Sequence, residues 1–351
     1  MTLQQHRKDD HLTLARELYQ NQSHIDFTQT RFVHHSLPQL DVADVSLNNK
    51  LGELSFSTPF FINAMTGGST MSKKINEQLA FVAKNTGLAM ASGSLSLALK
   101  DNSTIDTFKI IRQTNPTGLV FANLGVDYSV EQAKRAIDLL EAQALQLHIN
   151  VIQELAMPEG DRIFSGWLQA IETLVNQLNI PVIVKEVGFG MSRETMHQLQ
   201  QVGVQYIDVA GVGGTNFARI ENSRNSLPFY SLNDWGQSAI ISLMEADSLS
   251  QKPHLVASGG IHTPLDVVKC LALGADVVGV SGFFLHCITT YGVDETIHIV
   301  TQWQNEIKAI MTALGASTVK DLQKTDILLA PTVRDWCEAR MIDWKKFANR
   351  C

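Results

Sequence analysis

The fold is decided by the stretch Leu145-Gln146-Leu147-His148-Ile149-Asn150-Val151-Ile152-Gln153-Glu154, in which apolar and polar residues alternate over the first seven positions. A period of two predicts a β-strand whose two faces meet different surroundings. Amphipathic helical patterns flank the strand at 129–143 and 165–179, so we expect its apolar face to pack on helices. The polar face then has to point into the interior of a parallel barrel, near its functional mouth.

The same unit, a short apolar strand followed by an amphipathic helix, recurs from Pro59 onward. Helix starts are marked by a capping box at Ser129 and Gln132 and by proline at the first helical position in Thr263-Pro264. Eight units in about 230 residues favour an α/β fold of the (β/α)8 TIM-barrel type over a doubly wound sheet. The predicted strands are Phe60–Ala64, Leu88–Ser92, Leu119–Asn123, Leu145–Asn150, Val182–Lys185, Tyr206–Ala210, Leu255–Ser258 and Val277–Val280.

The remaining segments are predicted to be additions to a single domain that spans residues 1–351. A hairpin of Val45–Leu47 and Leu54–Phe56 is expected to plug one barrel end, and a helix is expected within 9–20. The long polar segment 216–234 is typical of a mobile lid. The expected parts are an N-terminal lead-in over 1–57, the barrel core over 58–290, and C-terminal helices over 291–351, with helical patterns at 293–314 and 332–349.

Composition excludes several classes of function. The chain has 351 residues, a formal charge of -7 and a sequence pI near 5.9, which give no electrostatic case for nucleic acid or an anionic membrane. No apolar run suits a signal peptide or a membrane span. The four cysteines, Cys270, Cys287, Cys337 and Cys351, lack Cys-x-x-Cys spacing, so we expect a reducing cytoplasm.

Glycine-rich segments follow several of the predicted strands. Gly259-Gly260 and the segment 279–282 lie after the seventh and eighth strands, where barrels of this kind commonly bind phosphate. The alternative is a tight turn. Ala64-Met65-Thr66-Gly67-Gly68 would let a planar ring lie against backbone, with an ordinary turn as the alternative. Gly213-Gly214-Thr215 suits a wall beside such a ring. The latter does not fit the Gly-x-Gly-x-x-Gly dinucleotide fingerprint.

Charged residues near the strand ends suggest a site for an anionic ligand. Lys185 ends the fifth strand, where a cation stabilises negative charge on a bound ring; the alternative is a salt bridge with Glu186. Glu154 suits Mg²⁺ that is also held by substrate phosphate, and its polar neighbours outweigh the alternative of an exposed glutamate at a helix start. Arg7 and Lys8 form either a solvated terminus or a diphosphate clamp.

With these residues together, the chain resembles the FMN-dependent, type 2 isopentenyl-diphosphate isomerases. The resemblance covers nearly the whole chain, and its most specific part is the arginine–lysine start combined with His-x-Asn-x-x-Gln-Glu. The matching elements are Arg7-Lys8-Asp9-Asp10-His11, Ala64-Met65-Thr66-Gly67-Gly68, Ala122-Asn123-Leu124-Gly125, His148-x-Asn150-x-x-Gln153-Glu154, Val184-Lys185-Glu186-Val187-Gly188, Gly213-Gly214-Thr215 and Ser258-Gly259-Gly260-Ile261.

The resemblance implies a role for each matching residue. The implied catalytic residues are His148, Gln153, Glu154 and Lys185, with Glu154 as the Mg²⁺ ligand. The implied substrate contacts are Arg7, Lys8, His11, His148, Asn150 and Gln153. The implied FMN set is Ala64, Met65, Thr66, Ser94, Asn123, Lys185, Thr215, Gly259, Gly260, Ser281 and Gly282. Some members carry Ser-x-Arg where this chain has Ser94-Leu95-Ser96, so Lys100 or the N-terminal basic pair is expected to replace that arginine.

The implied activity is the interconversion of isopentenyl and dimethylallyl diphosphate, a step of isoprenoid biosynthesis. Reduced FMN serves as the acid/base, Mg²⁺ anchors the diphosphate, and NADPH keeps the flavin reduced. The resemblance also implies a homo-oligomer, a tetramer or octamer, that binds neither nucleic acid nor membrane.

Three other functions remain as alternatives. An FMN-dependent 2-hydroxy-acid oxidoreductase wants a histidine base after the sixth strand, and 210–219 contains none. A purine-nucleotide dehydrogenase wants a cysteine in that loop, which is also lacking. A binding module without catalysis leaves the polar face of 146–150 unexplained.

Overall fold

The computed structural model describes residues 3–19 and 22–350, and the side chains of residues 3–7 lie outside that description. Within this part of the chain, eight parallel strands close a barrel in the order β10-β11-β4-β5-β6-β7-β8-β9. Pairing of Val278 with Phe60 joins β11 to β4 and closes the ring. The predicted (β/α)8 barrel is therefore confirmed. The strands are β4 (Phe60–Ile62), β5 (Met90–Ala91), β6 (Val120–Gly125), β7 (Ala144–His148), β8 (Val182–Lys185), β9 (Tyr206–Asp208), β10 (His254–Ser258) and β11 (Val277–Val280).

Amphipathic helices surround the barrel and begin where the sequence predicts. Ser129 and Gln132 form a capping box before α6, and Thr263 forms another with Asp266 before α12, whose first residue is Pro264. The outer helices are α3 (Thr70–Thr86), α5 (Asp106–Thr114), α6 (Val130–Leu140), α8 (Trp167–Gln177), α9 (Arg193–Gln201), α11 (Ala239–Asp247), α12 (Pro264–Ala272) and α14 (Gly292–Ala313). Shorter elements follow the strands as α4 (Ser96–Lys100), η2 (Asn102–Thr104), α7 (Val151–Ala156), α10 (Phe217–Arg224), η3 (Tyr230–Leu232) and α13 (Gly282–Thr290).

The barrel interior changes from apolar to polar along the strand direction. One buried cluster contains the inward residues near the strand starts: Phe61, Phe121, Ala144, Ile183, Tyr206, Val256 and Val277. A second, polar set of inward-facing residues lies two positions further along six of these strands, and all of its members are buried. The set consists of Asn63, Asn123, Gln146, Lys185, Asp208 and Ser258. Leu145 and Leu147 belong instead to the core between strands and helices. The alternation in β7 therefore has the meaning that the sequence predicts.

The lead-in plugs the apolar end of the barrel, as expected. β2 (Asn49–Leu51) and β3 (Leu54–Phe56) form an antiparallel hairpin whose apolar residues join the inner cluster. The predicted first strand at Val45–Leu47 is wrong, because the chain turns at Gly52 and pairs Leu51 with Leu54. Gly52 has a φ of 57°, and a Cβ there would lie 2.4 Å from the Tyr206 hydroxyl, so this tight turn needs glycine.

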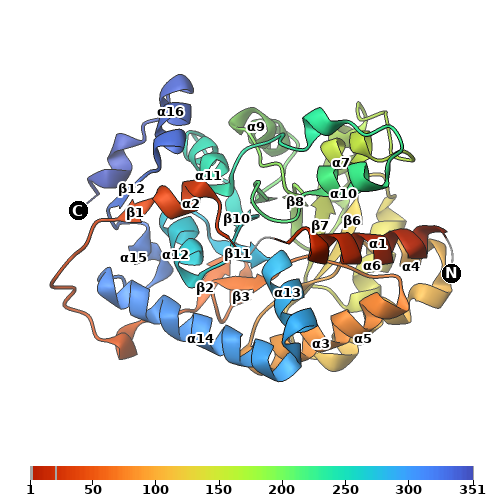
Figure 1. Ribbon diagram of the computed structural model, residues 1–351, viewed down its shortest axis with the longest axis horizontal. Helices are drawn as coiled ribbons and strands as arrows, with labels where there is room; N and C mark the ends of the chain where they lie inside the picture. The colour runs from red at the N-terminus through yellow and green to blue at the C-terminus, as the bar shows by residue number, and fades with distance from the viewer. Residues whose placement is uncertain (1–2, 20–21, 351) are drawn as a thin grey trace.

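The other N-terminal elements reach both the mouth and the far end of the chain. α1 (Leu3–Glu17) contacts α3, α10 and α13, which places it beside the carboxyl ends of the strands (Figure 1). α2 (Ile25–Gln29) and η1 (Val42–Asp44) flank β1 (Arg31–Phe32). β1 pairs in antiparallel fashion with β12 (Ile327–Leu328), which joins the lead-in to the C-terminal segment.

Two other expectations need correction. The polar segment 216–234 contains helix α10 and the turn η3, because Asn216 caps α10 by accepting a hydrogen bond from the Arg219 N–H. The helical pattern at 332–349 is two elements, α16 (Pro331–Ala339) and η4 (Lys345–Ala348), which follow α15 (Val319–Leu322). None of the helices in the described part of the chain is long and apolar enough to cross a membrane.

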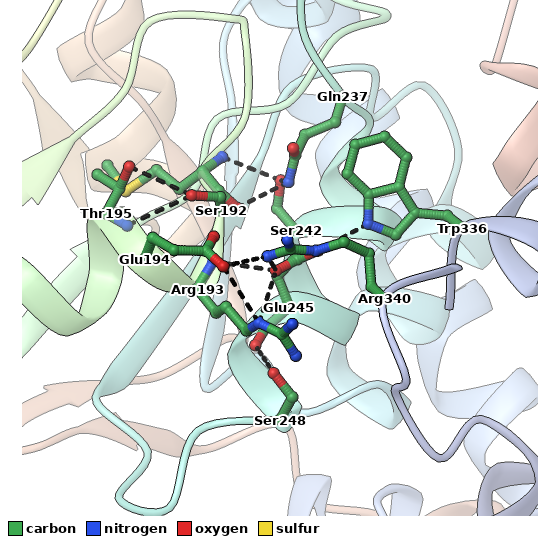
Figure 2. A network of polar contacts seen from close by, with 11 residues as sticks. Ser192, Arg193, Glu194, Thr195, Gln237, Ser242, Glu245, Ser248, Trp336 and Arg340 are labelled. Atoms are coloured by element: carbon green, nitrogen blue, oxygen red, sulfur yellow. Dashed lines mark hydrogen bonds and ion pairs between the residues drawn. The ribbon is translucent and has the colours of Figure 1, made fainter. Parts of the chain in front are cut away.

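A buried carboxylate attaches α16 to the barrel helices (Figure 2). Glu245, on α11, has a fully buried side chain and accepts from Trp336 Nε1 at 2.7 Å and from Arg340 Nε at 2.9 Å. Its other oxygen accepts from the Arg193 backbone N–H at 3.1 Å. Burial raises the pKa of Glu245, but the hydrogen bonds from Arg340 and Trp336 outweigh burial and the net pKa is lowered. Glu245 is therefore an anion that joins α9, α11 and α16.

Candidate active site

A cavity of about 1270 Å³ opens at the carboxyl ends of the barrel strands, where enzymes of this fold have their active sites. Its volume is sufficient for a nucleotide-sized cofactor and a second small ligand. Arg7 lies outside the described side chains, so its expected role has no structural counterpart here. The sequence-predicted residues that line the cavity are Lys8, His11, Ala64, Met65, Thr66, Ser94, Asn123, His148, Asn150, Gln153, Glu154, Lys185, Thr215, Gly259, Gly260, Ser281 and Gly282.

Glycine backbones form one wall of the cavity. Gly259 has a φ of 89°, and a Cβ there would lie 1.9 Å from the Gly211 carbonyl oxygen. A Cβ on Gly214 would lie 3.0 Å from the Gly260 nitrogen, so the loops after β9 and β10 meet backbone to backbone. Helix α13 begins beside them at Gly282, and its N-terminus adds a favourable dipole for an anion. This arrangement fits the phosphate of a flavin mononucleotide.

Lys185 ends β8 in the polar layer of the barrel. Its Nζ lies 3.4 Å from Asp208 Oδ2 and donates to the Glu186 carbonyl oxygen at 2.8 Å. The alternative of a salt bridge with the Glu186 carboxylate is wrong, because one oxygen of that carboxylate accepts from the backbone N–H groups of residues 187–189. Burial raises the pKa of Glu186 to about 7, although those bonds and Lys185 act against it. The ammonium of Lys185 is thus held by Asp208 at the base of the cavity.

The motif His148-x-Asn150-x-x-Gln153-Glu154 is divided between two elements. β7 ends at His148, Asn150 occupies the N-cap position, and Gln153 and Glu154 lie in the first turns of α7. The prediction that the strand reaches Asn150 is therefore wrong, whereas Gln153 and Glu154 do lie just past the strand end, and all four residues line the cavity. The helical turn lets Asn150 Nδ2 lie 3.2 Å from Gln153 Oε1 and 2.8 Å from Glu154 Oε1.

Glu154 has the donor chemistry of a ligand for Mg²⁺ that is shared with a phosphate. Its Oε1 accepts from Asn150, and its Oε2 accepts from the Asp161 backbone N–H at 2.8 Å, so the carboxylate is held in one orientation. Among the described residues, no group of three or more His, Cys, Asp or Glu side chains is arranged to hold a metal ion. A cation at Glu154 would therefore depend on substrate oxygens and water, a mode that suits Mg²⁺.

Glu221, on α10, is a site residue that the sequence does not indicate. Its buried carboxylate accepts from Gln153 Nε2 at 3.0 Å and lies 2.9 Å from His11 Nε2. The other oxygen pairs with Arg224 at 2.7 Å. Burial raises the pKa of Glu221, but the hydrogen bond and charge of His11 and the contacts with Gln153 and Arg224 give a net lowering. A glutamate in a segment read as a polar loop carries no signal of burial, which is why it was missed.

Tyr19 lines the cavity beside the glycine wall, and the sequence does not indicate it as a site residue either. Its hydroxyl lies 3.2 Å from His262 Nδ1, and its ring stacks on His286 with the centroids 4.6 Å apart. Nε2 of His262 lies 3.3 Å from the Gly213 carbonyl oxygen. Burial raises the pKa of Tyr19 far above its ordinary range, so the hydroxyl stays neutral. The segment after α1 is thereby attached to the glycine wall, a long-range contact for which no sequence pattern exists.

Comparisons with known proteins agree with this geometry. The model of the family described as FMN-dependent dehydrogenase matches residues 124–329. An isopentenyl-diphosphate delta-isomerase of Staphylococcus saprophyticus is 47% identical over 339 residues, which are 96% of this chain and 97% of that protein. The enzyme of the same name from Latilactobacillus sakei is 47% identical over 340 residues, 97% of each chain. The one from Staphylococcus aureus is 46% identical over 338 residues, 96% of this chain and 97% of that protein.

Solved structures give a likeness of fold. Mandelate oxidase with (S)-2-phenylpropionate has a TM-score of 0.65 at 15% identity, over 92% of this chain and 94% of that one. Mandelate oxidase with benzoyl-formic acid has a TM-score of 0.64 at 15% identity with the same coverage. At such identities the likeness concerns the barrel alone.

Proposed function

The chain belongs to the FMN-dependent, type 2 isopentenyl-diphosphate delta-isomerases, and on that premise we propose that the cavity residues named above perform the isomerisation with reduced FMN and Mg²⁺. The reaction interconverts isopentenyl and dimethylallyl diphosphate. It adds a proton at one carbon of the double bond and removes a proton from another, with no net redox change. The observation that carries the proposal is that Gln153 and Glu154 line the same cavity as the glycine wall and Lys185.

The residues divide into a cofactor side and a substrate side. On the cofactor side, the glycine wall with Ser281 and Gly282 would hold the FMN phosphate. Ala64, Met65, Thr66, Ser94, Asn123 and Thr215 would line the ring. Reduced FMN supplies and takes up the protons when it is bound. Lys185 would hold positive charge beside the ring, where preorganised charge stabilises a developing anion.

On the substrate side, Glu154 would hold Mg²⁺ against the diphosphate, and Lys8, with Arg7 and His11, would supply further contacts. A magnesium ion held by Glu154 would supply positive charge to the diphosphate and so help to orient the hydrocarbon. Gln153, fixed by Asn150 and Glu221, would lie at the alkene. Lys100 also lines the cavity, which supports it as the replacement for the arginine of Ser-x-Arg.

Three finer statements rest on the resemblance. We propose NADPH as the reductant of FMN, a homo-oligomer (tetramer or octamer) as the assembly and the cytoplasm as the compartment. The buried thiols of Cys270, Cys287 and Cys337 are free, which supports a reducing compartment. The sedimentation coefficient of the purified protein tests the number of subunits. The rate at which NADPH or NADH reduces bound FMN, followed by flavin absorbance, tests the identity of the reductant.

An anaerobic isomerase assay tests the proposed function. The protein is loaded with FMN and incubated with isopentenyl diphosphate, with the flavin oxidised or reduced and with Mg²⁺ or a chelator. We expect dimethylallyl diphosphate only with reduced FMN and Mg²⁺. Oxidation of lactate, glycolate or mandelate, without isomerase activity in any arm, would establish the 2-hydroxy-acid oxidoreductase alternative instead.

A further inference from the structure

A line of hydrogen-bonded side chains crosses the polar layer of the barrel from Asp208 to His148. Asn63 Nδ2 donates to Asp208 Oδ2 at 2.8 Å, and Gln146 Nε2 donates to Asn63 Oδ1 at 2.9 Å. Asn123 Nδ2 donates to Gln146 Oε1 at 3.2 Å, and His148 Nδ1 lies 2.9 Å from Asn123 Oδ1. Asp208, Asn63 and Gln146 are fully buried, and Asn123 is 3% exposed. Four successive hydrogen bonds thus connect Asp208, the ion-pair partner of Lys185, with His148 of the proposed substrate pocket.

The carboxylate of Asp208 gives this line its direction. An ionised carboxylate accepts hydrogen bonds and donates none, whereas each amide has one donor end and one acceptor end. Lys185 at 3.4 Å, the Ser258 hydroxyl at 2.6 Å and the Ala210 N–H at 3.2 Å all present donors to Asp208, which is the surrounding of an anion. Asn63 must therefore turn its NH₂ group toward Asp208.

Each later amide then has a single satisfied orientation. The Ala64 backbone N–H also donates to Asn63 Oδ1, at 2.8 Å, and this contact favours the same orientation of Asn63 that the carboxylate requires. Because Asn63 offers an acceptor, Gln146 must offer its NH₂ group, and Asn123 must do the same toward Gln146. Reversal of one link would leave a buried donor and a buried acceptor without partners, which is unfavourable.

The line ends at His148 Nδ1, which faces the side-chain oxygen Oδ1 of Asn123 and so has to carry a proton. Burial, followed by the positive charges of Lys8 and Lys185, lowers the pKa of His148 to about 3, although the Leu124 carbonyl acts in the opposite direction. The imidazole is therefore neutral, and its second nitrogen, Nε2, bears a lone pair. A Cβ on Gly125 would lie 3.5 Å from this nitrogen, so glycine leaves room beside it.

We infer that Asp208 is a positioning residue which, through Asn63, Gln146 and Asn123, holds His148 as the Nδ1–H tautomer with an accepting Nε2. In this tautomer, Nε2 accepts from a donor such as an ammonium group or water, and it does not donate to a phosphate oxygen. His148 would then order the donors around the diphosphate. Only the identity of the substrate in this inference rests on the proposed function. The tautomer of His148 does not depend on a bound substrate.

Nitrogen NMR of the FMN-loaded full chain, labelled with ¹⁵N in the histidine rings, measures the tautomer directly. Subtraction of the spectrum of a His148→Gln variant assigns the signals of His148. We expect a protonated Nδ1 and an unprotonated Nε2 that do not change between pH 8 and pH 5. In Asp208→Asn, the new amide can donate to Asn63, so the line of hydrogen bonds loses its fixed direction. The fraction of His148 in the Nε2–H tautomer should then rise at least tenfold. Ser258→Ala, which removes a hydrogen bond to Asp208 but keeps the carboxylate, should leave the tautomer unchanged.

Two results would overturn the inference. One is a wild-type protein whose His148 is the Nε2–H tautomer or is doubly protonated at pH 7. The other is a folded Asp208→Asn variant in which the tautomer of His148 is unchanged. If that variant does not fold, Gln146→Met interrupts the line and leaves the charge of Asp208 in place. Loss of the tautomer preference is then expected, and its retention contradicts the inference. The readout does not use turnover, so an active isomerase with the other tautomer rejects this inference alone, and the expected tautomer without isomerase activity rejects the proposed function alone.

Discussion

Gln153 Nε2 donates to Glu221 Oε1 over 3.0 Å, and this contact joins α7, which carries the specific sequence motif, to α10. His11 of α1 approaches the same oxygen at 2.9 Å. Three segments that are distant in sequence thus meet at one buried carboxylate at the mouth of the barrel. The orientation of the Gln153 amide is determined there, because its nitrogen faces Glu221 and its oxygen faces Asn150.

Glu221→Gln should lower kcat about 100-fold, with a smaller change in KM. The new amide presents a donor where Gln153 and His11 require an acceptor, and a misplacement of roughly 1 Å costs about this much. Steady-state isomerase kinetics with reduced FMN measure the effect. Glu159→Gln is the matched control, since Glu159 also pairs with Arg224, at 3.6 Å, but is 48% exposed. Equal effects of the two substitutions would show that Glu221 contributes only charge.

Glu154→Gln should weaken the apparent Mg²⁺ affinity during turnover by roughly 10–100-fold or more, because a neutral amide oxygen is a poorer ligand for a hard cation. Titration of isomerase activity with Mg²⁺ measures the change. Asp161→Asn provides the control, because it removes a neighbouring charge and keeps the backbone N–H that holds Glu154. An unaltered Mg²⁺ dependence in Glu154→Gln would remove this residue from the metal site.

Gly259→Ala should weaken FMN binding at least about tenfold, which corresponds to 1.4 kcal/mol. The added methyl group would lie 1.9 Å from the Gly211 carbonyl oxygen, so one of the two loops has to move. Quenching of flavin fluorescence on binding to apoprotein measures the affinity. Gly274→Ala is matched in backbone strain, with a φ of 108°, but has no atom within 4 Å of the new methyl group among the described residues. It should bind FMN normally.

Glu245→Gln should lower the free energy of unfolding at pH 7 by about 1–3 kcal/mol, because Trp336 and Arg340 lose the anion that accepts their hydrogen bonds, while Arg340 keeps its contact with Glu194. The pKa of Glu245 is lower in the folded protein than its ordinary value of 4.5. The ion contributes its full stability above pH 4.5 and loses it as the pH falls through the folded pKa. The difference between variant and wild type should therefore shrink below pH 4.5. Urea unfolding followed by circular dichroism measures it, with the exposed Glu338→Gln of the same helix as control. A difference that is constant with pH would contradict the ionic role.

The barrel could be predicted because its signals are local. Alternation in β7, capping boxes at Ser129 and Thr263 and apolar strand segments each need only a few neighbouring residues. The strand ends were predicted less accurately than the strands themselves. The strand β7 was predicted to reach Asn150 but ends at His148, because Asn150 instead occupies the N-cap position of α7. Polar side chains and glycines at strand ends were also visible in the sequence, since the carboxyl ends of all parallel strands meet at one mouth.

The partners within the site could not be predicted, because they depend on how the barrel closes. Lys185 was expected beside Glu186, its neighbour in sequence, but its carboxylate partner is Asp208 on the adjacent strand. Glu221 and Tyr19 lie in segments that read as a polar loop and a lead-in. Their burial results from contacts with residues more than 60 positions away, Gln153 and His262 respectively.

The pairing of β1 with β12 determines when the enzyme becomes complete during translation. Arg31 pairs with Leu328 and Phe32 with Ile327, so β1 is synthesised well before its partner β12 is available. Helix α1, which brings Lys8 and His11 to the mouth, also rests on α13, near residue 290. Helix α1 also contacts α3 and α10, which are synthesised earlier, so α13 and β12 add the last contacts that hold the N-terminal segments against the barrel.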